Sequence, residues 1–257
     1  MIIKRDCIYP PTGKNRPLHI YLPDEYDTSD QRYPVMYFFD GHNLFSNEDA
    51  TYGKCWGLKE FLDGWDQKII LVGIECGHEG DERLSEYLPY RPGFGPLFNF
   101  RPMGELTMNW IVNDIKPMID KEFRTLPQRE HTAIGGSSMG GLMALYAITE
   151  YNDWFFGGAC VSTATGLCYR SVVNSVKKAL LQKETRVYLS WGTREAFLLR
   201  DRTKPDSSSI TWRQNRMVAK LLKRNGAQVK LVCQVGGRHC EADWEKQNNR
   251  FMDFIWK

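Results

Sequence analysis

The segment "HTAIGGSSMGGLMALYAI", residues 131–148, sets two adjacent serines among glycines directly before an apolar stretch. It fits the pattern G-x-S-x-G in one register, Gly136 to Gly140, which makes Ser138 the candidate nucleophile. Small flanking residues suit a sharp strand-to-helix turn that holds a serine in strained backbone and exposes its hydroxyl. A phosphate-binding loop would need a lysine after the glycines, and none follows. The segment therefore predicts a nucleophilic serine.

A serine hydroxyl needs a histidine to take its proton and a carboxylate to orient that histidine. Of the five histidines, His239 is the best placed, because it follows an apolar strand expected at 229–235 and precedes the last expected helix. This puts it in a loop at the carboxyl edge of the sheet, where α/β active sites assemble. We therefore expect His239 to be the base.

The carboxylate is expected after the strand at 186–191, where the chain reads "WGTREAF" and places Glu195 between the serine and the histidine. Serine, acid and histidine in this order are the α/β-hydrolase arrangement. Asp201 and Asp206, farther along the same connection, are the alternative acids. A plain surface role for Glu195 also stays open.

An oxyanion hole is expected where "YPVMYFFDGHNLF" runs a buried strand into the turn Asp40-Gly41-His42-Asn43. The predicted donors are the backbone amides of Met139 and His42, with Asn43 as the near alternative and a candidate for binding substrate. Asp-Gly and Asn are also common turn formers, so a purely structural turn stays open.

Apolar runs bounded by Gly, Pro, Asp or Asn predict strands at 17–23, 33–39, 68–75, 131–136, 155–162, 186–192 and 229–235. Helices are expected at 105–123, at 211–224 and in the last segment, 242–257. Pro117 predicts a bend or a break in the first helix, and the capping-box spacing of Thr211 and Gln214 predicts the start of the second. Alternating strands and helices predict one α/β domain, residues 1–257, with a mostly parallel sheet covered on both faces.

Composition excludes several classes of function. The net charge is +3, and the 34 Lys and Arg are spread along the chain, which argues against nucleic acid as the main partner. No apolar run approaches the ~18 residues of a membrane span. The amino terminus lacks the hydrophobic region of a secretion signal, so we expect a cytoplasmic protein. The seven cysteines show no CxxC pair and no zinc-like histidine spacing, and we expect neither a metal nor another cofactor.

Residues 76–104 show no clear periodicity and are expected to form a long loop that packs on the domain. Aromatic rings in this loop, with Trp191 and Trp212, are candidates to stack on a phenolic acyl group, and core packing is the alternative. The rings are those of Tyr87, Tyr90, Phe94, Phe98 and Phe100. Arg83, Arg91 and Arg101 would favour an anionic substrate, although loop arginines are more often solvated.

Several segments together resemble the "putative esterase" family of α/β hydrolases, over about residues 15–257. They are "YPVMYFFDGHNLF", "RLSEYLP", "IVNDIKPMIDKEFRTLPQREHTAIGGSSMGGLMALYA", "WGTRE" and "GGRH". The family includes feruloyl and acetylxylan esterases, siderophore trilactone esterases, S-formylglutathione hydrolase and mycolyltransferases. The resemblance implies Ser138 as nucleophile, Glu195 as acid, His239 as base and residues 40–43 as the oxyanion loop.

The implied activity is hydrolysis of small acyl esters, such as acetyl or feruloyl esters, through an acyl-enzyme. The residues "DGHN" stand where many feruloyl-type members have a His-Gly-Gly-type loop, and are more similar to the siderophore-esterase branch. A siderophore esterase, an acyltransferase to a sugar or alcohol, and a binding protein on the same scaffold are therefore the alternatives. The sequence does not predict an oligomeric state.

Overall fold

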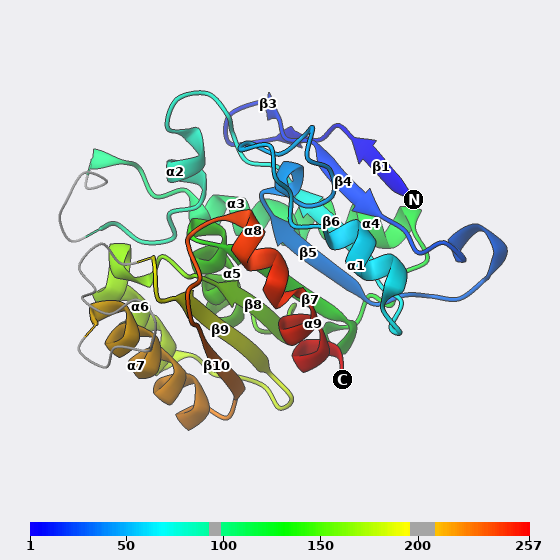
Figure 1. Cartoon of the computed structure of the whole chain (residues 1–257). Coiled ribbons are helices and arrows are strands. Elements are labelled where there is room, and N and C mark those ends of the chain that lie inside the picture. Colours follow the sequence, from blue (N-terminus) through cyan, green and yellow to red (C-terminus); the bar gives the residue numbers. More distant parts are fainter. Residues whose placement is uncertain (93–98, 196–208) are drawn as a thin grey trace.

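A computed structural model describes residues 1–92, 99–195 and 209–257, and its central feature is an eight-stranded sheet (Figure 1). The strand order is β1-β4-β6-β5-β7-β8-β9-β10. All neighbouring pairs from β6 to β10 are parallel, whereas β4 pairs antiparallel with both β1 and β6. The strands are β1 (Ile2–Arg5), β4 (Leu18–Tyr21), β5 (Val35–Phe39), β6 (Ile70–Ile74), β7 (Thr132–Ser137), β8 (Gly157–Val161), β9 (Arg186–Gly192) and β10 (Gln228–Gln234). The mostly parallel sheet is confirmed.

Helices cover both faces of the sheet. The helices of the described residues are α1 (Leu58–Gly64), α2 (Glu82–Glu86), α3 (Gly104–Trp110), α4 (Lys116–Glu122), α5 (Met139–Glu150), α6 (Tyr169–Lys178), α7 (Ile210–Arg224), α8 (Glu241–Trp244) and α9 (Asn248–Trp256), of which α2 lies on the connection after β6. Side chains alternate along each strand, so Tyr37 of β5 packs in one core with α3 to α7, and its neighbour Phe38 packs in a second core with α1, α8 and α9. Figure 1 shows α8 and α9 in front of the sheet.

All seven predicted strands are present, but local details differ from the predictions. Strand β1 and a short hairpin, β2 (Ile8–Tyr9) with β3 (Lys14–Asn15), were not predicted. The expected loop at 76–104 contains α2. The capping-box prediction is wrong, because α7 begins at Ile210 after Ser209, and no side chain of the described residues caps its first turn.

The helix expected at 105–123 is interrupted, as Pro117 predicted. A π-helical turn, Ile111–Ile115, separates α3 from α4. Pro117 lies in the first turn of α4, where a proline is tolerated because a backbone N–H at this position would have no partner within the helix. Within the three described ranges of the chain, no helix combines the length and the apolar character needed to cross a bilayer.

Candidate active site

Ser138 lies at a sharp turn between β7 and α5. Its backbone has φ 56° and ψ −118°, a region that residues with a side chain rarely occupy. The turn depends on its glycines, because a Cβ at Gly136 would lie 2.6 Å from the carbonyl carbon of Gly140. A Cβ at Gly140 would lie 3.0 Å from the Cβ of Phe39. The glycines in "GGSSMGG" therefore allow β7, α5 and β5 to approach closely enough to form this corner.

The backbone of Ser138 is held on both sides, and its hydroxyl is left free. Its N–H donates to Val161 O at 3.0 Å, and its carbonyl accepts from Leu142 N at 3.0 Å and Ala164 N at 2.9 Å. Ser138 and His239 line the same cavity, which has a volume of about 420 Å³. In the described part of the chain, Ser138 Oγ makes no hydrogen bond, with His239 or with any other residue. The hydroxyl is therefore available to a substrate in this cavity.

His239 lies on the connection between β10 and α8 and faces the predicted carboxylate. His239 Nδ1 is 3.4 Å from Glu195 Oε2, slightly longer than the usual range for such a hydrogen bond. The imidazole also contacts the indole of Trp244 edge to face, with ring centroids 4.9 Å apart. The His239 side chain is 43% exposed and that of Glu195 10% exposed. The acid is thus enclosed while the imidazole reaches the cavity.

Ser162, which was not predicted from the sequence, hydrogen-bonds both Glu195 and the buried Trp244. It follows β8 and has a positive φ of 46°. Its hydroxyl donates to Glu195 Oε1 at 2.6 Å and accepts from Trp244 Nε1 at 2.8 Å. Glu195 Oε1 also accepts from Gly192 N at 2.7 Å. One serine therefore orients both the carboxylate and the indole that packs on His239.

Asp243 anchors the loop that carries His239. Its Oδ2 accepts from both the backbone N and the Nε of Arg238, each at 2.9 Å, and its Oδ1 accepts from Lys246 Nζ at 2.6 Å. Burial by itself would raise the pKa of Asp243, but the hydrogen bonds from Lys246 and Arg238 hold it well below its ordinary value. Asp243 therefore acts as a charged tether beside the imidazole.

The turn after β5 lines the same cavity and contains an amide without a hydrogen-bond partner among the described residues. Asp40 adopts a left-handed conformation, φ 62° and ψ 51°, which starts the turn. The N–H of Asn43 donates to Asp40 O at 2.9 Å and is occupied. Over the described ranges, the amides of His42 and Met139 make no hydrogen bond. They are also the two predicted oxyanion donors, and Met139 N lies at the positive amino end of α5.

Two more charged side chains line the cavity: Arg83, which the sequence named as a candidate to favour an anionic substrate, and Glu241, which it did not. Arg83 donates to both carboxylate oxygens of Asp40, at 2.7 and 2.8 Å. Burial favours the neutral form of Asp40, but Arg83 lowers the pKa of this carboxyl below its ordinary value. Glu241 also lines the cavity, and burial raises its pKa. Arg83 and Asp40 are 43 residues apart, and no local sequence pattern pairs them.

Of the remaining predicted residues, Asn43 belongs to the cavity and Trp191 does not. Asn43 lines the cavity, and its side-chain oxygen accepts from Thr51 N at 2.9 Å. Trp191 is only 4% exposed, packs against Trp212 with ring centroids 4.8 Å apart, and does not line the cavity. This arrangement favours the core-packing alternative for Trp191. Four residues named from the sequence, Phe94, Phe98, Asp201 and Asp206, lie outside the described residues.

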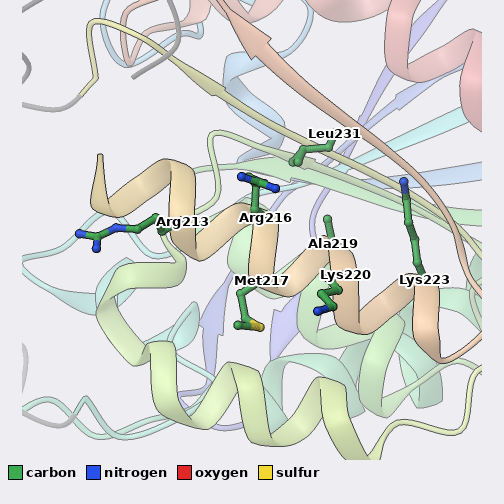
Figure 2. Close-up of a pocket in the computed structure, with 7 residues that line it drawn as sticks. All are labelled: Arg213, Arg216, Met217, Ala219, Lys220, Lys223 and Leu231. Atoms are coloured by element: carbon green, nitrogen blue, oxygen red, sulfur yellow. The ribbon is translucent and has the colours of Figure 1, made fainter. Parts of the chain in front are cut away.

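A second hollow lies away from this site, between α7 and β10 (Figure 2). It has a volume of about 590 Å³. Its described lining consists of Arg213, Arg216, Met217, Ala219, Lys220, Lys223 and Leu231. These residues include no carboxylate, histidine or hydroxyl nucleophile. The arrangement suited to ester chemistry is therefore the cavity at Ser138.

Comparison with known proteins gives one family and several similar structures. A family model described as "Putative esterase" matches residues 10–250. The protein YbbA of Bacillus subtilis is 26% identical over 222 residues, which cover 85% of this chain and 82% of YbbA. An IroE-like serine hydrolase from Shewanella oneidensis has a TM-score of 0.75 at 19% identity, covering 99% of this chain and 79% of that one. The enterobactin esterase Fes from Shigella flexneri has a TM-score of 0.73 at 15% identity, and its match covers all of this chain and 58% of Fes.

Proposed function

The chain belongs to the putative esterase family and is a carboxylic-ester hydrolase, and we propose that it works through an acyl-enzyme formed on Ser138. In this proposal His239 is the general base and Glu195 is the acid that orients it. The observation that carries the proposal is that Ser138 and His239 line one cavity while Glu195 lies 3.4 Å behind the imidazole.

The protonation states follow from these contacts. With a proton on Nδ1 directed at Glu195, His239 keeps a lone pair on Nε2 to take the proton of Ser138. Ser138 Oγ attacks the ester carbonyl, and the resulting tetrahedral intermediate expels the alcohol, which receives the proton from His239. Water then attacks the acyl-enzyme by the same route and releases the acid. The net reaction consumes one water and gives one acid and one alcohol.

The charge that develops on the carbonyl oxygen needs donors that are free before the substrate arrives. The amides of His42 and Met139 meet this requirement, whereas the amide of Asn43 is occupied by Asp40 O. Removing one oxyanion donor typically slows such reactions about 10²–10³-fold. We assign His42 and Met139 as the two donors within the proposed mechanism.

The test replaces the nucleophile and its neighbour separately. Ser138→Ala should lower hydrolysis of p-nitrophenyl acetate by at least about 10³-fold, since the remaining groups cannot form an acyl-enzyme. Ser137→Ala is the matched control and should keep labelling by a fluorophosphonate probe, with the added mass on Ser138. Wild-type rates in Ser138→Ala, or labelling at another residue, would reject this mechanism.

The substrate is proposed at the level of class. Small acyl esters, acetyl or feruloyl, are the first candidates, and the cytoplasmic location expected from the sequence stays a prediction. A catecholate trilactone is the second candidate, supported by the "DGHN" turn and by the fold shared with the enterobactin esterase Fes. Rates on methyl ferulate, acetylated xylo-oligosaccharides and a catecholate trilactone would rank these classes. Product analysis with added alcohols would identify acyl transfer.

A further inference from the structure

Three side chains that bind metals in many proteins meet in the wall of the active-site cavity. They are His42, on the turn after β5, and Cys76 and His78, on the connection after β6. One donor atom from each lies within 4.8 Å of the others. The rings of His42 and His78 meet edge to face with centroids 4.6 Å apart. The mechanism proposed above uses none of these three side chains.

His42 carries a ring nitrogen with no partner. The residue is 6% exposed, and its Nε2 lies 3.0 Å from Thr51 Oγ1. Its Nδ1 is buried, and within the described residues it has no hydrogen-bond partner. A buried polar atom left unpaired typically costs about 1–3 kcal/mol.

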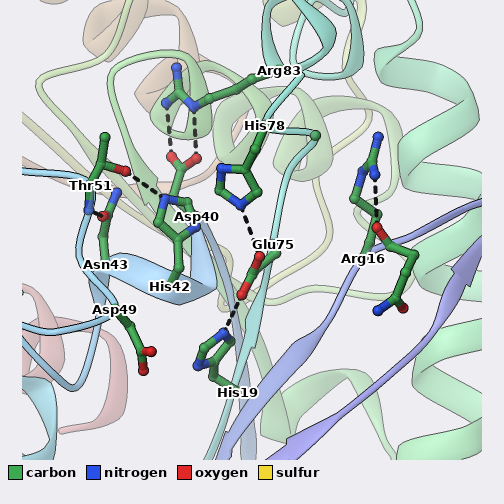
Figure 3. A network of polar contacts seen from close by, with 12 residues as sticks. Arg16, His19, Asp40, His42, Asn43, Asp49, Thr51, Glu75, His78 and Arg83 are labelled. Carbon is green, nitrogen blue, oxygen red and sulfur yellow. Dashed lines mark hydrogen bonds and ion pairs between the residues drawn. The ribbon is translucent and has the colours of Figure 1, made fainter. Parts of the chain in front are cut away.

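In His78, as in His42, the Nε2 atom has a hydrogen-bond partner. His78 Nε2 lies 2.9 Å from Glu75 Oε2, and the other oxygen of Glu75 lies 2.5 Å from His19 Nε2 (Figure 3). The carboxylate therefore fixes the Nε2–H form of His78 and leaves Nδ1 as the atom with the lone pair. A histidine that binds a metal usually donates its second N–H to a carboxylate or another acceptor in this way.

We propose that His42, Cys76 and His78 bind one divalent transition-metal ion, Zn²⁺ in first place, through two imidazole nitrogens and a thiolate. In a tetrahedral zinc site, with Zn–N about 2.0–2.1 Å and Zn–S about 2.3 Å, donor atoms lie roughly 3.3–3.6 Å apart. The three donors, which lie within 4.8 Å of one another, would close by at most about 1.5 Å to reach this spacing, and the side chain of His78 is 54% exposed. The ion replaces the thiol proton of Cys76, which leaves to solvent through the cavity.

Three protein ligands leave a fourth position open, and in this site it faces the cavity lined by Ser138 and His239. A water or an oxygen of a substrate would occupy it. Imidazole and thiolate favour Zn²⁺, Co²⁺ and Cu²⁺ over Mg²⁺ and Ca²⁺, which prefer oxygen ligands. No sequence pattern announces this site, because His42 is separated from Cys76 by a helix and a strand.

The test measures metal binding directly, so that it does not depend on ester hydrolysis. The full chain, freed of metal by a chelator, is titrated with Zn²⁺ by calorimetry and with Co²⁺ by absorbance. We expect one equivalent of Zn²⁺ and a thiolate-to-cobalt charge-transfer band. Cys76→Ser should abolish the band, and His78→Ala should weaken Zn²⁺ binding at least tenfold. Cys7→Ser and His131→Ala, at a half-buried cysteine and a half-buried histidine that do not line the cavity, are the matched controls and should bind as wild type does.

Glu75→Gln tests the contact between the Glu75 carboxylate and His78 Nε2. Loss of a carboxylate that orients a ligating histidine typically weakens metal binding about 10–100-fold. Circular dichroism of each variant confirms that it is folded. Wild-type protein that binds less than one Zn²⁺, or a cobalt band that persists in Cys76→Ser, would overturn the proposal. Either result would leave the role of Ser138 untouched, because neither measurement reads ester hydrolysis.

Discussion

Glu195 is held by three groups at once, and each contact has a separate consequence. Ser162 and Gly192 fix one carboxylate oxygen, and His239 faces the other. A surface carboxylate would have no such set of partners and would be far more exposed than 10%. The contacts therefore support the acid role proposed for Glu195.

Glu195→Gln should keep the fold of the site and lower kcat for p-nitrophenyl acetate by about 10²–10⁴-fold, because the amide favours the wrong imidazole tautomer. KM should change little. Asp201→Asn and Asp206→Asn are the controls and should retain wild-type kcat. A large loss in either control, with Glu195→Gln unaffected, would move the acid to that position.

We expect Ser162 to act by positioning the carboxylate of Glu195. Ser162→Ala removes the hydroxyl that joins Glu195 to Trp244, so we expect kcat to fall about tenfold or more while KM stays near wild type. The pH profile of kcat/KM should also shift, because the carboxylate that faces His239 loses one donor. Ser171→Ala on α6 is the matched control. An unchanged pH profile would assign Ser162 a purely structural role.

At the scale of elements, the turn between β7 and α5 depends on close approach of backbone atoms. Gly136→Ala places a methyl group 2.6 Å from the Gly140 carbonyl carbon, and neither strand nor helix can yield without moving Ser138. We expect unfolding free energy to fall by about 1–3 kcal/mol and ester hydrolysis to be lost. Gly64→Ala, where a methyl group meets open space, should stay within about 0.5 kcal/mol by urea unfolding. Full activity in Gly136→Ala would contradict this account.

The loop between β10 and α8 should be sensitive to acid through Asp243. Its pKa is lower in the folded chain than its ordinary value of 3.8, because Lys246 and Arg238 outweigh the effect of burial. Between these two pKa values the unfolded chain binds more protons, so the free energy of unfolding rises with pH there. The contribution of Asp243 to the free energy of unfolding is present above its ordinary pKa, at about pH 4, and is lost as the pH falls below that value.

Asp243→Asn should therefore be less stable than wild type at pH 7, by about 1–3 kcal/mol. Its free energy of unfolding should fall less steeply than that of wild type between pH 4 and pH 2. Urea unfolding over a pH series measures both quantities. Parallel curves for the two proteins below pH 4 would show that Asp243 makes no pH-dependent contribution.

At the scale of the whole molecule, the site is assembled from loops at the carboxyl ends of β5 to β10 and depends on the cores beneath them. Phe251 of α9 is fully buried and contacts the rings of Phe38, Trp56 and Tyr188. Trp56 in turn stacks on Trp244, with centroids 5.6 Å apart. This aromatic cluster links the sheet to the segment that follows His239.

Phe251→Ala should lower the free energy of unfolding by about 3–5 kcal/mol, because it leaves a cavity in a closely packed core. For a chain of this size the melting temperature should fall by roughly 6–20 °C. Leu180→Ala is the control at a residue that is 92% exposed, and its melting temperature should stay near wild type. A wild-type melting temperature in Phe251→Ala would show that this cluster is not a stabilising core.

Much of the fold could be predicted from the sequence because its signals are local. Strands of a covered sheet are mostly apolar runs, and seven were recognised in this way: the six parallel strands β5 to β10 and the antiparallel strand β4. The edge strand β1 was missed because its residues, Ile2–Arg5, are too few and too polar to give a pattern. Helix α2 was missed because a five-residue helix shows little more than one period.

The sequence by itself determined the strand and helix pattern and the candidate nucleophile, since these depend on residues close together along the chain. It also determined the chain order of serine, acid and histidine, which is read directly from the residue numbers. Only the tertiary structure decided which amides are free at the turn after β5, that Ser162 and Asp243 hold the acid and base loops, and that Arg83 pairs with Asp40. It alone also brought His42, Cys76 and His78 together. Ser162 and Glu195, Arg83 and Asp40, and His42 and Cys76 are pairs far apart in the sequence, and the parallel sheet brings them together by placing the carboxyl ends of its strands at one edge.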